Sequence, residues 1–156
     1  MNFPRMLGVV LAGIVLTGAA AAQQKAPADV IKARHEQMKA LGADFKTIND
    51  ALKTDAPAVA AIAAAGKHMA ETIKGLNALY PAGTGPDSGV KTRALPEIWL
   101  QNAAFKSAAD ASEAESVKFA VTATVGNVEA IKTGFKALTD SCVACHNKFR
   151  APEEKK

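Results

Sequence analysis

The sequence has 156 residues, of which 49% are hydrophobic and only 5% aromatic, and its formal net charge is +4. The positive charge is not gathered into a basic block or an arginine stripe, so the composition argues against nucleic-acid binding. The chain has only two cysteines, which excludes the dense disulfide framework of a small secreted scaffold.

The first 22 residues have the pattern of a secretory signal peptide. A basic opening is followed by an apolar run from Met6 to Leu16 and then by small residues that end at Ala22. The apolar run is too short to cross about 30 Å of hydrocarbon comfortably, which favours cleavage over a retained membrane anchor. We therefore predict a signal peptide at residues 1–22, and one exported domain, without a membrane segment, at residues 23–156.

Four later segments repeat apolar or small residues at alternating three- and four-residue spacing, which is typical of helices packed along a seam. The longest break runs from Tyr80 to Leu95 and holds three glycines and two prolines. The third segment is the weakest, because Asn102, Ser112 and Ser116 fall on its stripe. The pattern predicts an all-α fold, an antiparallel up-down-up-down four-helix bundle. The expected helices span residues 28–52, 56–79, 96–124 and 128–149.

The sequence Cys142-Val143-Ala144-Cys145-His146 is the attachment signal of c-type haem. Two thiols at i and i+3 face the same side of a helix, so both can add to the vinyl groups of one porphyrin. The adjacent His146 can then give a ring nitrogen to the iron as the proximal axial ligand. Both cysteines fall on the apolar stripe of the last helix, so we expect one covalently bound haem c inside the bundle.

Three other interpretations of the two cysteines remain open at this stage. A thioredoxin-like dithiol is found near a βαβ pattern, which this sequence lacks. A structural zinc site needs about four ligands, and only His35 and His68 remain to complete one. A plain disulfide suits an oxidising compartment. Both of these histidines are next to a stripe residue in the sequence, so we expect them at the surface.

Beyond the haem motif, several segments resemble the class II cytochromes c, which comprise cytochrome c' and its low-spin relatives of the cytochrome c-556 type. Residues 30–34 and 38–42 resemble the first helix of that family, residues 90–93 and 96–99 resemble its loop into the third helix, and residues 142–150 resemble its ending. The resemblance covers nearly the whole chain after the signal peptide. Together with the signal peptide, it implies a periplasmic haem protein that exchanges electrons with redox partner proteins and that can form a homodimer. We do not expect an enzyme, because the sequence offers no acid–base or nucleophilic groups for catalysis beyond the haem.

The resemblance also implies what lies on the distal face of the haem. It places Met38 there, four residues after Arg34, and a thioether is a good ligand for haem iron. We therefore expect a His/Met-ligated, low-spin iron that transfers electrons. The alternative is that Met38 only packs over a five-coordinate, high-spin iron, as in cytochrome c', whose open distal site would bind nitric oxide or carbon monoxide. Met69, the other methionine after the signal peptide, is expected in the core.

Two arginines complete the expected haem environment. Arg34 lies on a buried stripe, which is costly for an unpaired cation, and the resemblance implies that it contacts a haem propionate. The alternative is that Arg34 extends to water at the edge of the bundle. Arg150, one helical turn after His146, resembles the arginine that neighbours the proximal histidine in the family, and the alternative is a solvated charge at the helix end. Trp99 and Phe105 are expected as core aromatics near the porphyrin edge.

Overall fold

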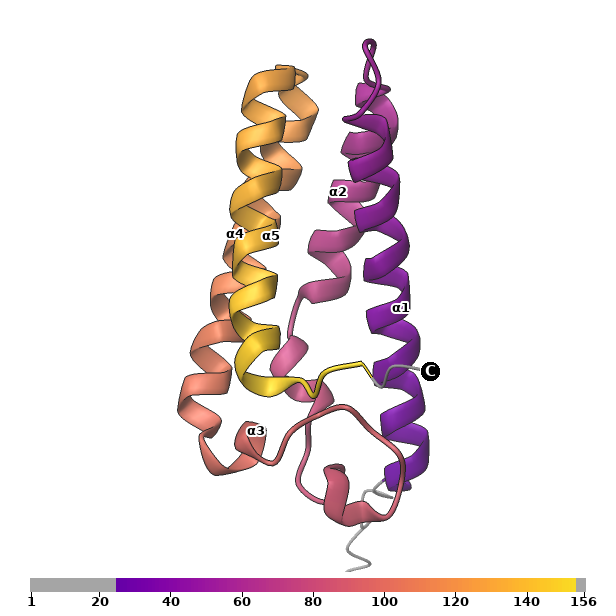
Figure 1. The fold of residues 1–156 in the computed structure, drawn as a ribbon, viewed down its shortest axis with the longest axis vertical. Coiled ribbons are helices and arrows are strands. Elements are labelled where there is room, and N and C mark those ends of the chain that lie inside the picture. The colour runs from indigo at the N-terminus through magenta and orange to yellow at the C-terminus, as the bar shows by residue number, and fades with distance from the viewer. Residues whose placement is uncertain (1–24, 154–156) are drawn as a thin grey trace, which may run out of the picture.

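The computed structural model describes residues 25–153, and this part of the chain is helical with antiparallel long helices (Figure 1). The long helices are α1 (Pro27–Ala51), α2 (Val59–Ile73), α4 (Asn102–Val125) and α5 (Val128–Phe149). Three short elements lie between α2 and α4, namely η1 (Leu76–Leu79), η2 (Pro86–Ser88) and α3 (Glu97–Leu100). The predicted four-helix bundle is confirmed. The predicted signal peptide lies outside the described residues.

The structure divides two of the four predicted helices. The predicted helix at residues 56–79 ends earlier, because Gly75 adopts a left-handed φ of 69° and separates α2 from the short η1. The predicted helix at residues 96–124 is interrupted at Gln101, whose φ of −120° and ψ of 45° separate α3 from α4. The first and last predicted helices agree with α1 and α5 to within one residue. The Asn127 side chain caps α5 by accepting a hydrogen bond from the Ala130 amide at 3.0 Å.

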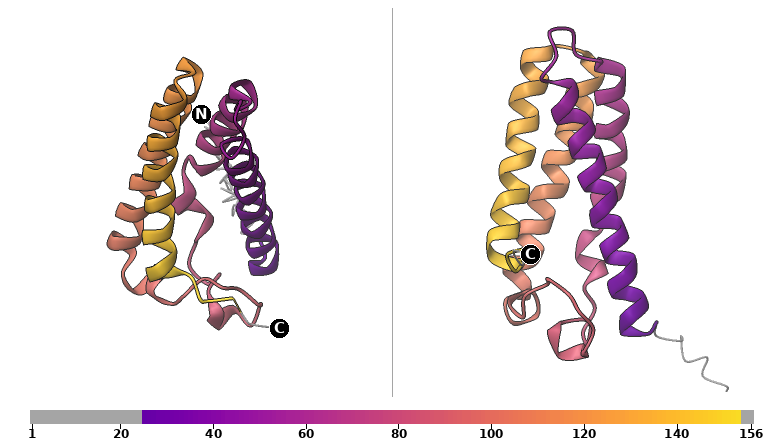
Figure 2. Two further views of the ribbon diagram at one scale, coloured as in Figure 1. Left: turned by 45° about the horizontal axis from the view of Figure 1, so that its top comes forward. Right: turned by 45° about the vertical axis from the view of Figure 1, so that its right-hand side comes forward.

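The bundle consists of two helical hairpins, α1–α2 and α4–α5, that lie face to face (Figures 1 and 2). α2 packs closely against α4, whereas the backbones of α1 and α5 make few close approaches. Side chains bridge these two helices at one level, where the ring centroids of Phe45 and Phe135 lie 4.9 Å apart. One side of the bundle is therefore closed by backbone packing, and the opposite side is only bridged by side chains.

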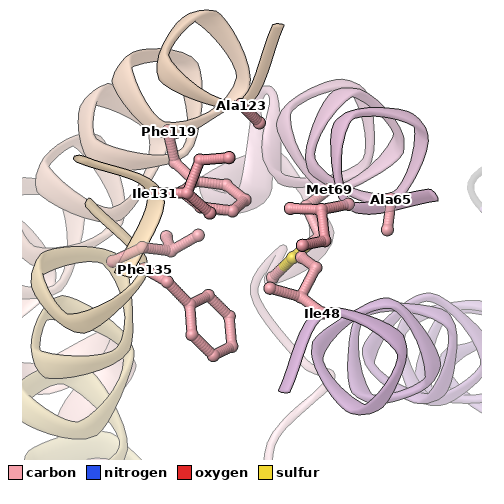
Figure 3. Packing of buried hydrophobic residues seen from close by; sticks show 9 residues of the cluster. Ile48, Ala65, Met69, Phe119, Ala123, Ile131 and Phe135 are labelled. Carbon is pink, nitrogen blue, oxygen red and sulfur yellow. The ribbon is translucent and has the colours of Figure 1, made fainter. Parts of the chain in front are cut away.

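The main core draws side chains from all four long helices (Figure 3). Met69 of α2 is 3% exposed and belongs to this cluster, so its predicted core position is confirmed. In Figure 3, Met69 and Ile48 point towards Phe119 and Ile131 on the opposite hairpin. The buried members of the cluster are Ile48, Ile62, Ala65, Met69, Phe119, Ala123, Ile131, Phe135 and Leu138.

The residues of the weak third stripe that lie in α4 are buried, except for Asn102 at the start of that helix. Ser112 and Ser116 are buried, and their hydroxyls donate hydrogen bonds to the carbonyls of Ala108 at 3.1 Å and Glu113 at 2.7 Å in the same helix. These local bonds satisfy the buried hydroxyls without a partner from another helix. Asn102 is exposed instead. Within residues 25–153, no helix is both long enough and apolar enough to span a bilayer.

Candidate functional site

The haem motif occupies the last two turns of α5, at the end of the bundle where α1 begins (Figure 1). Cys145 is buried in a second apolar cluster with Phe105 and Phe149, whereas Cys142 is partly buried against the main core. The two cysteines are not joined by a disulfide, and His146 is partly buried beside them. The helix therefore presents two thiols one turn apart on its inner side, as the sequence predicted.

The Phe45–Phe135 contact shows which part of α1 lies opposite the motif. Met38 comes seven residues before Phe45 on α1, and Cys142 comes seven residues after Phe135 on α5. Because the two helices are antiparallel, both residues lie about 10 Å from that contact in the same direction along the bundle. Both side chains are only partly buried. They lie at the same level on two helices whose backbones make few close approaches. Two thiols one helical turn apart with a histidine directly after them are the donor set of a covalently attached haem, so the residues present fit that group.

Aromatic rings pack in the cluster that contains Cys145. The Tyr80 and Phe105 centroids lie 4.8 Å apart with edge-to-face geometry, and those of Phe105 and Phe149 lie 5.2 Å apart in the same geometry. The Trp99 indole donates hydrogen bonds at 3.1 Å to the carbonyls of Tyr80 and of the next residue. Phe105 thus lies in the core in the same cluster as Cys145, and the Trp99 indole binds the chain that carries Tyr80.

Arg34 of α1 is buried and is fully engaged with the long connection. Its guanidinium donates to the Thr92 hydroxyl at 2.9 Å, to the carbonyl and hydroxyl of Thr84 at 3.1 and 3.3 Å, and to the Leu79 carbonyl at 3.5 Å. It also lies 4.5 Å from the centroid of the Tyr80 ring. The alternative in which Arg34 extends to water is wrong, because the side chain is 4% exposed.

The partners of Arg34 among residues 25–153 are neutral groups. Burial lowers the pKa of Arg34, but a guanidinium remains protonated in proteins. A buried cation that has only neutral partners would be stabilised by an added carboxylate. The predicted contact with a haem propionate is compatible with this arrangement and remains a prediction.

The environment of His146 favours a neutral imidazole. Burial lowers the pKa of His146, and the positive charges of Arg150 and Arg93 lower it further. A neutral imidazole has a ring nitrogen free to bind a metal ion. The Arg150 backbone amide donates to the His146 carbonyl at 3.0 Å, and its side chain is exposed. Arg150 is thus next to His146, as predicted, whereas the influence of Arg93 was not foreseen.

The described residues offer little support for the alternative uses of the cysteines. Burial raises the pKa of both the Cys142 and Cys145 thiols, whereas a reactive thioredoxin-like dithiol depends on a lowered thiol pKa. No group of three or more His, Cys, Asp or Glu side chains suited to a metal ion occurs within residues 25–153. His35 and His68 are exposed, as predicted, and His68 Nδ1 lies 2.6 Å from Asp44 Oδ2.

The long connection supplies contacts that the sequence did not predict. Tyr80, Thr84, Thr92 and Arg93 all come from this connection or its immediate start. Their partners are distant in the chain, since Arg34 precedes Thr84 by 50 positions and Arg93 precedes Ala151 by 58. No local pattern in the sequence signals such pairs.

Comparisons with known proteins agree with this geometry. The family model of Cytochrome C' matches residues 29–150. The cytochrome c' of Rhodospirillum rubrum is 33% identical over 92% of this chain and 96% of its own length. A solved cytochrome c' with ligand-controlled dimer dissociation has a TM-score of 0.76 and 28% identity, over 83% of this chain and 99% of its own. A nitric oxide complex of a variant cytochrome c' from Alcaligenes xylosoxidans has a TM-score of 0.72 and 27% identity, over 81% and 97% respectively.

These comparisons correct the predicted sixth iron ligand. We expected Met38 to complete a His/Met-ligated, low-spin iron dedicated to electron transfer, and this expectation was wrong. The relatives are cytochromes c', the branch for which the resemblance implied a five-coordinate iron. The physical reason for the error is that a methionine at the correct helical position can pack against a haem without bonding its iron. Matched over nearly all of its described length in sequence and in fold, the chain belongs to the cytochrome c' family.

Proposed function

We propose that this protein carries one haem c, attached through Cys142 and Cys145, whose five-coordinate, high-spin iron binds nitric oxide or carbon monoxide. One observation carries the proposal. The haem motif on α5 lies opposite a partly buried apolar stripe on α1, on the side of the bundle where the backbones of α1 and α5 make few close approaches. The bound haem would supply an iron with an open coordination position for a diatomic ligand. The proposed activity is ligand binding without substrate turnover.

The chain's own residues hold the haem and exclude water from it. Cys142 and Cys145 form the covalent attachment, and the neutral imidazole of His146 is the proximal ligand. The rings of Tyr80 and Phe105 cover the end of the site beside Cys145. Met38 belongs to the distal wall on α1, where it limits the room for a ligand but does not bond the iron.

Arg34 and Arg150 carry the nearby positive charges. Because Arg34 is buried among neutral partners, a propionate would complete its charge pairing. Arg150 lies at the end of the helix that carries His146, and its charge disfavours protonation of that imidazole. The two arginines thus favour an anionic haem edge and a neutral proximal ligand.

We also propose a periplasmic location and a homodimeric state. The location follows from the expected signal peptide and from the oxidising, exported setting that suits covalent haem attachment. The dimer is supported by a structural neighbour at a TM-score of 0.76 whose dimer dissociates under ligand control. Redox partner proteins in the same compartment would set the oxidation state of the iron.

The test is the optical spectrum of protein exported in a host that attaches haem. We expect the mass of one added haem, no reactive thiol, a high-spin spectrum in both oxidation states, and a spectral change when carbon monoxide or nitric oxide is added to the ferrous form. A sharp low-spin spectrum before gas addition would contradict the open site. Unpigmented protein with free or mutually bonded cysteines would contradict the haem itself. The matched variants Cys142→Ala and Cys145→Ala should each retain at most one covalent link.

A further inference from the structure

The chain that follows α5 is fastened to the long connection just before α3. The Leu95 amide donates to the Phe149 carbonyl at 3.0 Å, and the Ala151 amide donates to the Arg93 carbonyl at 2.8 Å. Ala94 and Arg150 form an antiparallel bridge between these two bonds. We call this pairing of residues 93–95 with residues 149–151 the C-terminal clasp.

The Arg93 side chain adds hydrogen bonds to the backbone bonds of the clasp. Its Nε and Nη2 atoms both donate to the Ala151 carbonyl, at 3.0 and 2.8 Å. The planar guanidinium can direct two donors at one oxygen, which the single ammonium of a lysine cannot reproduce with the same geometry. The remaining contact of Arg93, Nη1 to Glu153 Oε1, is 3.9 Å long and exposed, so it contributes little.

The clasp lies where α5 would otherwise fray. The last four carbonyls of an α-helix have no partner within the helix, and the final turn loosens easily unless other groups bind them. In α5 the Phe149 carbonyl is bound by the Leu95 amide and the His146 carbonyl by the Arg150 amide. His146 is only three residues before the end of α5, so the turn that aims its imidazole is the turn that the clasp holds.

The clasp also connects to the packing of the site. Phe149 is 3% exposed and shares the second apolar cluster with Cys145 and Ala94. The long connection therefore meets the haem-binding turn in two ways, through the hydrogen bonds of Arg93 to Ala151 and through the packing of Ala94 against Cys145 and Phe149.

We infer that Arg93 is a positioning residue for the proximal ligand: by clasping Ala151 it fixes the last turn of α5 and restricts the orientation of the His146 imidazole on the iron. This inference rests on the proposed function, because it presumes that His146 binds haem iron. It assigns to the long connection a part in the proximal site, although that connection contributes no ligand. Arg93 acts through the backbone of residues 149–151 and does not touch the iron.

The experiment compares four variants of the haem-loaded protein. Arg93→Ala removes the side-chain donation to Ala151 and the charge but leaves the backbone bonds of the clasp, whereas Arg93→Lys keeps the charge but not the paired donation. Glu153→Gln removes only the exposed contact of Arg93, and Lys132→Ala removes one positive charge from the far end of α5, where Lys132 pairs with Glu129. Two quantities are measured: hydrogen exchange of the peptide that covers residues 146–153, and the width of the iron–histidine stretching band of the ferrous protein by resonance Raman spectroscopy.

We expect exchange in the Arg93→Ala peptide to be about tenfold faster, as for the loss of one to two net hydrogen bonds. We also expect a broader iron–histidine band, because the imidazole samples more orientations. Arg93→Lys should show intermediate values of both quantities, and it serves as the deciding variant if Arg93→Ala does not fold. Glu153→Gln and Lys132→Ala should match the wild type.

Three results would overturn the inference. Unchanged exchange in both Arg93 variants would show that the Arg93 side chain does not hold the helix end. Faster exchange with an unchanged band would show that the clasp is structural and does not reach His146. A wild-type band in Arg93→Lys, together with faster exchange, would show that charge acts rather than the clasp. A wild-type protein that lacks the iron–histidine band but keeps slow exchange at residues 146–153 would instead overturn the proposed function.

Discussion

The Phe119 ring lies between two glycines, and this arrangement gives a sharp test of the packing. A Cβ added at Gly66 of α2 would lie 2.9 Å from Phe119 Cε1 and 3.1 Å from Phe119 Cδ1. A Cβ added at Gly134 of α5 would meet Phe119 Cδ2 at 3.5 Å, which is ordinary van der Waals contact. Gly66→Ala and Gly134→Ala therefore add the same methyl group on two sides of one ring, with different room for it.

The expected effects follow from two opposing contributions. Replacing a glycine inside a helix with alanine stabilises the helix by about 1 kcal/mol. At Gly66 this gain is opposed by overpacking, which costs roughly 1–3 kcal/mol in a well-filled core. The ring has little freedom to move, because Phe119 is 1% exposed and its centroid is 5.6 Å from that of Phe135. We expect Gly66→Ala to lower the free energy of unfolding by about 1 kcal/mol and Gly134→Ala to raise it by up to about 1 kcal/mol.

The assay is thermal unfolding of the two haem-loaded variants, followed by far-ultraviolet circular dichroism. A difference of about 2 kcal/mol corresponds to a gap of roughly 8 °C in Tm for a domain of this size. The reasoning would be refuted if Gly66→Ala stabilised the protein as much as Gly134→Ala does. That result would mean that α2 can move away from Phe119 without cost, so the close approach would not fix the distance between the two hairpins.

Three further predictions concern the site. Arg34→Met should lower the free energy of unfolding by about 2 kcal/mol, because the carbonyls of Leu79 and Thr84 lose a charged donor, although removal of the buried charge offsets part of this loss. Urea denaturation measures the free energy of unfolding. A stabilised variant would show that burying the charge costs more free energy than its hydrogen bonds contribute. Met38→Ala should leave the gas-free spectrum high-spin and speed the association of carbon monoxide in flash photolysis. Conversion from a low-spin to a high-spin spectrum would show that Met38 is an iron ligand after all. In chain made without haem attachment, the raised thiol pKa values of the two cysteines mean less thiolate at a given pH, so alkylation near neutral pH should be slower than for a free thiol and should accelerate as the pH rises. Rapid alkylation at neutral pH would contradict the burial of these thiols.

The fold was largely predictable because helices depend on local spacing. The stripes of the first and last helices predicted α1 and α5 to within one residue, since a period of three to four residues is intrinsic to an amphipathic helix. The breaks at Gly75 and Gln101 were missed. The repeated pattern continued through both positions, and a single backbone conformation can interrupt a helix without changing the hydrophobic period.

The two arginines of the candidate site show what sequence could and could not supply. The stripe placed Arg34 in the interior, and the structure buries it there. Its hydrogen-bond partners at Thr84 and Thr92 could not be predicted, because they depend on how a connection rich in glycine and proline folds back over α1. Arg93 was part of a segment that resembles the family, but nothing in the sequence predicted its contact with Ala151.

The sequence by itself determined the long helices and predicted the haem-attachment motif of Cys142, Cys145 and His146. Each of these depends on residues within one or two helical turns, where backbone geometry fixes which side chains share a face. The tertiary structure alone decided that α1 and α5 stay apart beside the haem motif, that Arg34 is enclosed by the long connection, and that Arg93 holds the end of α5. These features depend on contacts between segments far apart in the chain, which residue type and spacing do not specify.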